Sequence, residues 1–109
     1  MPWLMRDGQV LATVEVADRF GSRMRGLLGR EQLDGAYLLR SARSIHTVGM
    51  RFPIDVAYCD RDLVVLETVS MPRHRVGRPR LRARCVIEAQ AGAFDRWRLA
   101  PGDRLEISG

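Results

Sequence analysis

Residues 52–69 have the sequence FPIDVAYCDRDLVVLETV, in which two apolar runs flank a short charged turn. Both runs, Ile54–Cys59 and Leu63–Val69, are rich in the β-branched and aromatic residues that favour strands. The segment Asp60-Arg61-Asp62 between them has the composition of a turn. Pro53 is expected at the start of the first strand, because proline cannot donate a backbone hydrogen bond within a central strand. The segment therefore predicts a β-hairpin.

More strands are predicted on both sides of this hairpin. Gln9–Val16 alternates apolar and other residues with the period of a half-buried strand. A short helix is expected at about residues 18–29, where apolar side chains after Asp18 recur with helical spacing. The remaining predicted strands are Ala36–Leu39, Ile45–Val48, Arg84–Glu88 and Arg104–Ile107. The pattern as a whole predicts a β-rich domain, a sandwich or small barrel, with one helix.

Length and charge limit the class of protein. The chain has 109 residues, with 18 arginines, no lysine and 13 acidic side chains, for a net charge of +5. We expect residues 1–109 to form a single domain without a linker. The all-arginine content has two explanations: selection for the guanidinium fork, or codon bias in a GC-rich genome, which we favour. With no signal-peptide core and no run of ~18 apolar residues, we expect a cytoplasmic protein without a membrane span.

The two cysteines do not form a recognisable motif. Cys59 and Cys85 lie far apart in the sequence and outside any CxxC spacing. Both occur in apolar segments, so we expect free, buried and reduced thiols. Neither a metal nor a cofactor is expected, because metal-ligand, phosphate-binding and nucleophile motifs are all missing from the sequence.

Asp55 and His46 are the candidate catalytic residues. On a strand, Asp55 would share a face with mostly small apolar neighbours, where a carboxylate is costly unless it is paired. One interpretation is a general base, with His46 as acid or orienting partner. The favoured interpretation is structural: the carboxylate, bonded to backbone N–H groups or to Arg23, Arg25 or Arg51, ties the helix to the hairpin. His46 is likewise expected to be a hydrogen-bonded, partly buried residue.

A second patch, RHRVGRPRLRAR, occupies residues 73–84. If this segment is extended, alternate arginines project from one face and could follow a phosphate backbone, an acidic protein or anionic head groups. The alternative is a solvated edge strand protected by Pro79 and its charges. Specific nucleic-acid binding is not expected, because no aromatic residue interrupts the patch to stack on bases. The anion-binding candidates are Arg73, Arg75, Arg78, Arg80, Arg82 and Arg84.

Three pieces of the sequence together resemble a known family. They are an Arg-x-x-Gly-Leu-hydrophobic-x-Arg signature, a His and a Met before a Pro-hydrophobic-Asp strand, and a hydrophobic-Glu-x-x-x-Gly piece with a closing Gly-Asp. The matching residues are Arg23, Gly26, Leu27, Leu28, Arg30, His46, Met50, Pro53, Ile54, Asp55, Asp60, Val86, Ile87, Glu88, Gly92, Gly102 and Asp103. In this order and spacing the chain resembles the domain of unknown function 192 family. The resemblance implies a compact, jelly-roll-like β domain with a short helix, and no assigned reaction.

Three functions remain open at this point. The leading hypothesis is a non-enzymatic module that binds a small molecule or a protein partner on the face around His46, Met50, Arg51 and Asp55. The alternative is a small enzyme with an Asp55/His46 acid–base pair. The third is a polyanion binder that uses Arg73–Arg84. Whether a reaction occurs stays undecided, and the non-enzymatic interpretation is favoured because nucleophile, metal and cofactor motifs are lacking.

Overall fold

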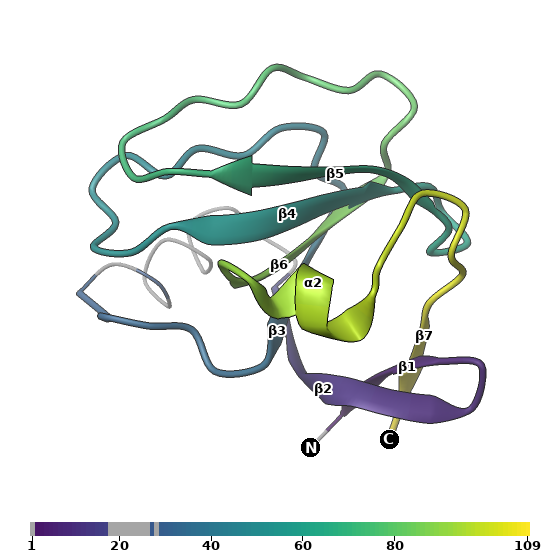
Figure 1. Ribbon diagram of the computed structural model, residues 1–109. Helices are drawn as coiled ribbons and strands as arrows, with labels where there is room; N and C mark the ends of the chain where they lie inside the picture. The colour runs from purple at the N-terminus through teal and green to yellow at the C-terminus, as the bar shows by residue number, and fades with distance from the viewer. Residues whose placement is uncertain (1, 18–26, 28) are drawn as a thin grey trace.

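The computed structural model describes residues 2–17, 27 and 29–109. These residues form one mixed, seven-stranded sheet and one short helix (Figure 1). The elements are β1 (Trp3–Arg6), β2 (Gln9–Ala17), β3 (Ala36–Arg40), β4 (Ile54–Cys59), β5 (Val65–Met71), β6 (Cys85–Gln90), α2 (Ala93–Trp97) and β7 (Glu106–Ser108). The fold is thus mainly β, as predicted, and compact, with a radius of gyration of 12.5 Å.

The strand order across the sheet is β5-β4-β6-β3-β2-β1-β7. All neighbouring strands are antiparallel except β2 and β3, which are parallel. The long strand β2 pairs with β1 through its first half and with β3 through its second half, from Val14↔Ala36 to Ala17↔Leu39. The sheet is not closed into a barrel, and the jelly-roll sandwich implied by the resemblance is not confirmed. Alternation within a strand does not say which strands pair, so the sequence left this arrangement undetermined.

Apolar side chains fill both faces of the sheet. All six residues of β4 are buried, and the five apolar ones divide between two clusters. Ala57 and Cys59 belong to the first cluster, which α2 covers with Ala93 and Phe94. Ile54, Val56 and Tyr58 belong to the second, which the segment before β4 covers with Ile45, Met50 and Phe52. A strand buried on both faces has a nearly continuous apolar sequence, which explains residues 54–59.

The hairpin prediction is confirmed, with shifted bounds. β4 and β5 are antiparallel neighbours, but β5 begins at Val65 instead of Leu63 because the turn is longer than expected. The Asp60 carboxylate accepts hydrogen bonds from the backbone N–H groups of Asp62 (2.8 Å) and Val64 (3.0 Å), and Leu63 has a φ of 63°. A side chain that caps its own backbone thus extends the turn by two residues.

Other predicted elements are corrected. The strand Ile45–Val48 is wrong, because only a single bridge joins His46 to Val76. β1 and α2 were not predicted, and the strands Arg84–Glu88 and Arg104–Ile107 are observed at Cys85–Gln90 and Glu106–Ser108. The predicted helix at about 18–29 lies outside the described residues except for Leu27, which is fully buried, and Gly29. Within the part of the chain that the structure describes, no helix is long and apolar enough to cross a membrane.

Candidate functional site

Asp55 makes a complete set of hydrogen bonds on β4, where it is only 5% exposed. Its Oδ1 accepts a hydrogen bond from the Ser70 hydroxyl (2.9 Å). Its Oδ2 accepts hydrogen bonds from the backbone N–H groups of Gly92 (2.9 Å) and Phe94 (3.1 Å). These bonds tie the β4–β5 hairpin to the start of α2. Arg23 and Arg25, two of the proposed partners, lie outside the described residues.

The other residues of the predicted face do not lie beside Asp55. Met50 is buried in the second cluster with Ile54, on the face of β4 opposite to the Asp55 carboxylate. His46 is half-buried in the segment that covers the second cluster, and its backbone bridges to Val76. Arg51 is exposed just before β4. The structure therefore divides the predicted binding face between the two sides of the sheet.

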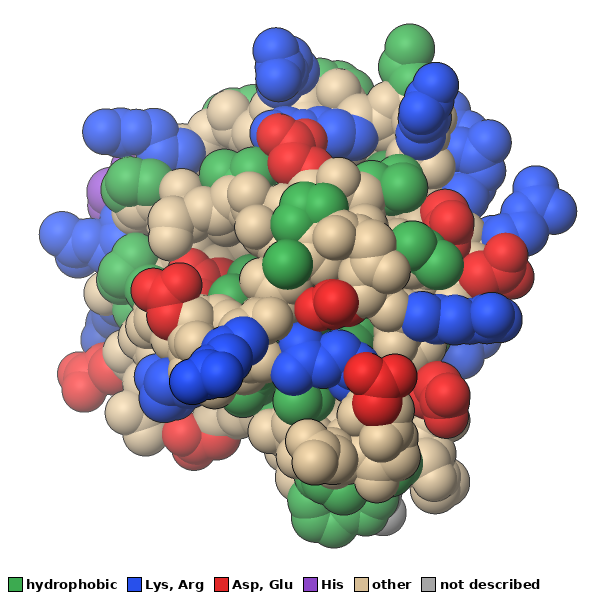
Figure 2. Space-filling model, turned by 45° about the vertical axis from the view of Figure 1, so that its right-hand side comes forward, with side chains coloured by type: hydrophobic (Ala, Val, Ile, Leu, Met, Phe, Trp, Pro, Cys, Tyr) green, Lys and Arg blue, Asp and Glu red, His purple; other side chains and the backbone are tan. Residues whose placement is uncertain are grey.

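The arginine patch at residues 73–84 is an irregular segment, not a strand. Backbone hydrogen bonds from Gly77 to Ile45 (2.7 Å) and from Arg80 to Arg43 (2.9 Å) hold it against the segment that follows β3. The predicted comb of alternating arginines is therefore wrong: Arg80 turns toward Glu67, whereas the other candidates are exposed. Figure 2 shows basic side chains spread over the visible face, with acidic side chains among them.

Arg80 has a structural role between β5 and the second cluster. Its guanidinium pairs with the Glu67 carboxylate at 2.8 Å and 3.3 Å. The same group lies 4.3 Å from the ring centre of Tyr58 and donates a hydrogen bond to its hydroxyl (3.3 Å). The hydrogen bond from Arg80 lowers the pKa of Glu67 below its usual value. Burial raises the pKa of Tyr58, and the positive charge of Arg80 opposes that rise.

Replacement of Arg80 by methionine should return the pKa of Glu67 toward its ordinary value and raise the pKa of Tyr58 further. Because the pKa of Glu67 is lowered in the folded protein, the pair stabilises the fold above the ordinary carboxyl pKa. This contribution is lost as pH falls through the lowered value. Since Glu67 is partly exposed, the contribution is about 0–1 kcal/mol. NMR titration of carboxyl carbons, with Arg82→Met as the control, checks this. An unchanged Glu67 titration in Arg80→Met would contradict it.

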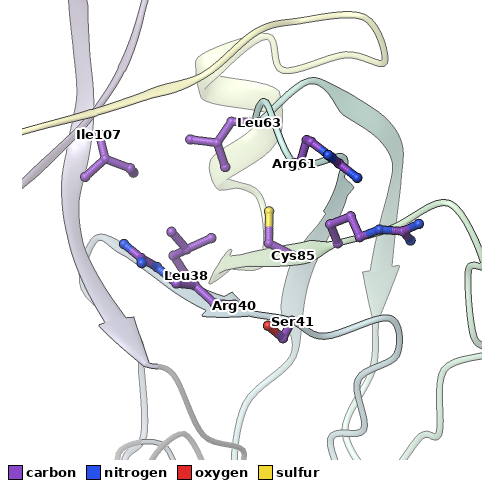
Figure 3. Close-up of a pocket in the computed structure, with 8 residues that line it drawn as sticks. Leu38, Arg40, Ser41, Arg61, Leu63, Cys85 and Ile107 are labelled. Carbon is purple, nitrogen blue, oxygen red and sulfur yellow. The ribbon is translucent and has the colours of Figure 1, made fainter.

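A cavity of about 470 Å³ opens on the side of the sheet where β3, β6 and the β4–β5 turn meet. Its lining residues come from four separate parts of the chain and include β7 (Figure 3). They are Leu38, Arg40, Ser41, Arg61, Leu63, Arg84, Cys85 and Ile107. A second cavity of about 570 Å³ is lined by Ser41, Arg43, Arg61 and Arg84, so the two share three residues and adjoin. We call this pair of cavities the arginine pocket.

The arginine pocket combines an apolar floor with a cationic rim. Leu38, Leu63 and Ile107 are apolar parts of its wall. Arg84 donates hydrogen bonds through Nη1 to the backbone carbonyls of Leu81 (3.1 Å) and Ala83 (3.0 Å), contacts that fix the side chain without neutralising its charge. Among the described residues, no ion pair involves Arg43, Arg61 or Arg84. The charges of these three side chains are therefore available to an anion.

Cys85 forms part of the pocket wall, and Cys59 lies directly opposite it in the β4–β6 register. Both thiols are free and buried, as the sequence predicted. The hydrogen bond from Cys59 lowers the pKa of Cys85, and the positive charge of Arg40 contributes in the same direction. That hydrogen bond, together with burial, raises the pKa of Cys59.

Several described residues of the predicted family signature hold turns and connections. Gly92 has a φ of 95° and donates to Asp55. Gly102, with a φ of 94°, donates to the carbonyl of Val65 (2.8 Å). Asp103 accepts hydrogen bonds through Oδ2 from Arg6 (3.0 Å) and from the backbone of Ala100 (3.0 Å). Other described signature positions include Leu27 and Glu88, which are buried, and Arg30 and Pro53, which are exposed.

The fold and these connections define a small mixed-sheet domain in which some of the signature residues secure its turns. The chain belongs to the DUF192 family, described as "Uncharacterized ACR", whose model matches residues 3–107. The resemblance inferred from the sequence is thereby confirmed. Among functionally curated proteins, no match was found.

Two solved structures are similar over nearly the whole chain. One is from Sinorhizobium meliloti 1021 and is described as "a putative transcription regulator". It is 25% identical, with a TM-score of 0.81 over 97% of this chain and 91% of that chain. The other is a protein of unknown function from Novosphingobium aromaticivorans DSM 12444. It is 18% identical, with a TM-score of 0.77 over 96% of this chain and 82% of that chain. The second likeness shows the fold alone.

Proposed function

We propose that this domain is a non-enzymatic binding module whose ligand is a small organic anion held in the arginine pocket. The observation that carries the proposal is that Arg43, Arg61 and Arg84 surround adjoining cavities without an ion-pair partner among the described residues. Exposed cations that line a hollow with apolar parts to its wall favour a ligand of opposite charge.

The chemistry of the pocket indicates the kind of anion. A guanidinium group binds carboxylate or phosphate through two parallel hydrogen bonds. The larger part of a ligand can rest on Leu38, Leu63 and Ile107, which contribute apolar contact. A cavity of about 470 Å³ is within the range of small-molecule sites. The expected ligand therefore has an apolar body and at least one carboxylate or phosphate.

The face around His46, Met50 and Asp55 has less support as the binding surface. Met50 is in the core, and both Asp55 oxygens accept hydrogen bonds from within the fold. A general base needs a free oxygen within reach of the proton that it removes. The enzyme hypothesis with an Asp55/His46 pair therefore ranks below the binding module.

A second candidate function is polyanion binding by the patch at residues 73–84. Five of its six arginines are exposed, all except Arg80. The described role of the Sinorhizobium meliloti relative, "a putative transcription regulator", is in keeping with a nucleic acid as the polyanion. Such binding falls steeply with salt, because it releases counterions from the phosphates. An affinity for mixed-sequence DNA that is insensitive to salt would exclude it.

Titration with phenyl phosphate, followed by amide NMR shifts, tests the proposed pocket. We expect shifts at residues 40–41, 61–63 and 84–85, and none at the Asp55 connection. Each charge-assisted hydrogen bond contributes about 1.5–3 kcal/mol. The double variant Arg61→Ala/Arg84→Ala should therefore weaken binding by at least roughly tenfold.

The matched control is Arg73→Ala/Arg82→Ala, which removes the same charge from exposed positions outside the pocket lining. This control should bind phenyl phosphate nearly as the wild type does. Equal weakening in both double variants would mean that only net charge matters, and would contradict the pocket. Phenol, which lacks the anionic group, should not bind in the same concentration range.

A further inference from the structure

We propose that Cys85 and Cys59 form a thiol–disulfide exchange site in the arginine pocket, whose substrates are small disulfides that carry carboxylates. The site shares a cavity with the proposed anion-binding function but does not depend on it, because exchange requires only access to Cys85 and a second thiol behind it. Its readout, a covalent change at sulfur, also differs from reversible anion binding.

The register of the sheet places the two cysteines opposite each other, as a disulfide between them requires. Cys59 and Cys85 are directly opposite each other on the antiparallel strands β4 and β6. Opposite residues of such strands have Cα atoms about 4.5 or 5.5 Å apart, depending on the type of pair. Both separations are within the usual disulfide range of roughly 4.4–6.8 Å. The two strands therefore do not have to separate or shift register for the bond to form.

The two thiols differ in access, which assigns their roles. Cys85 lines the cavity, and its side chain is directed into the space near Leu63 and Arg61 (Figure 3). Cys59 is fully buried in the first cluster, beside Cys85 on the neighbouring strand, and does not line the cavity. The lowered pKa of Cys85 agrees with this order, because the thiolate is the attacking form. Cys85 is thus the residue that meets the substrate, and Cys59 the residue that completes the exchange.

The reaction balances with the disulfide substrate as the only oxidant. The Cys85 thiolate attacks one sulfur of the substrate, a mixed disulfide forms, and the substrate's other half leaves as a thiolate. Cys59 then attacks the Cys85 sulfur, and its proton passes to the second half of the substrate, which leaves as a thiol. The protein is oxidised from dithiol to disulfide, and one substrate disulfide is reduced to two thiols.

The rim of the pocket selects the charge of the substrate. Arg61 and Arg84 line the same cavity as Cys85, and Arg40 is opposite Cys85 in the β3–β6 register. A disulfide whose carboxylates outnumber its ammonium groups is drawn toward this rim, whereas a cationic disulfide is repelled. Oxidised glutathione is a suitable anionic probe, and cystamine is its cationic counterpart.

The experiment treats the folded, reduced protein with each disulfide, alkylates the remaining thiols, and digests the protein with trypsin without reduction. Cleavage after arginine places Cys59 in peptide 52–61 and Cys85 in peptide 85–96. The wild type should yield these two peptides joined by a disulfide. Cys59→Ala should instead keep one glutathione on Cys85, and Cys85→Ala should keep none. Reaction with oxidised glutathione should be at least about tenfold faster than with cystamine.

Each contrary outcome overturns a defined part of the proposal. The exchange site would be overturned if the wild type retained both free thiols, or if the adduct formed on Cys59 in place of Cys85. The wild-type digest gives this answer even if a variant fails to fold. Equal rates with the two disulfides would overturn the substrate class. Phenyl phosphate binding without modification of Cys85 would leave the binding function intact. Modification of Cys85 without phenyl phosphate binding would leave only the exchange site.

Discussion

Asp55→Ala should lower the free energy of unfolding by about 3–5 kcal/mol, one of the two largest effects that we expect from a single substitution. The change removes three hydrogen bonds and leaves the backbone N–H groups of Gly92 and Phe94 without their acceptor. Each buried donor left unsatisfied costs roughly 1–3 kcal/mol. Thermal unfolding should show a fall in Tm of more than ~10 °C.

Two milder variants separate the hydrogen bonds from the rest of the side chain. Asp55→Asn keeps the shape and can still accept a bond from α2 and donate to the Ser70 hydroxyl, so we expect a smaller loss of about 1–2 kcal/mol. Ser70→Ala removes a single bond and should cost about 1 kcal/mol. An Asp55→Ala variant with the wild-type Tm would show that this carboxylate does not hold α2 to the hairpin.

Gly35→Ala should destabilise the fold by a comparable amount, about 3–5 kcal/mol. Gly35 has a φ of 73°, a backbone conformation that residues with a side chain rarely adopt. It directly precedes β3, where that strand pairs in parallel with β2. A Cβ atom there would lie 2.7 Å from the backbone carbonyl oxygen of Thr13 and against its Oγ1. The strained backbone costs roughly 1–3 kcal/mol, and the displaced strand adds a similar amount. Urea denaturation measures the total loss in the free energy of unfolding.

Gly8→Ala is the matched control for this substitution. Gly8 has a similar φ of 78°, but a Cβ atom added to it would meet nothing within 4 Å. Its replacement should therefore cost only the backbone strain, about 1–2 kcal/mol. If Gly35→Ala and Gly8→Ala have equal effects, the close approach of β2 at Thr13 contributes nothing, and the packing argument fails.

The sequence predicted the parts of the fold that depend on local chemistry. The hairpin follows from two β-rich runs and an aspartate-containing turn, all within residues 54–71. The segment Ile45–Val48 has the same local composition, yet it packs against Val76 and Gly77 and does not join the sheet. The residues that favour strands are those that fit a half-buried, pleated surface. A segment that packs over a sheet is also half-buried, so its composition can resemble that of a strand.

The candidate site was less predictable because it is assembled from distant residues. Arg40, Arg61 and Arg84 occur at the end of one strand, within a turn and just before another strand, and only the strand order brings them together. By contrast, the conspicuous run at residues 73–84 suggested a regular comb, but Arg80 pairs with Glu67 from β5. That partner is remote in the sequence, so spacing alone did not reveal it. The burial of Asp55 was predictable from its apolar neighbours, whereas its donors on α2 were not.

The shared strand β2 joins two parts of the sheet, which we expect to open as separate cooperative units. Its first half belongs to a three-stranded ribbon with β1 and β7, and its second half belongs to the larger β3–β6–β4–β5 unit. The ribbon is also attached where Val65 donates to Asp103 and Leu105 donates to Leu63. Amide hydrogens of β1 and β7 should therefore exchange with solvent through openings that leave β4 and β6 protected. Because Ile107 and Leu38 line the arginine pocket from these two units, the same openings should set how fast the proposed anion enters and leaves.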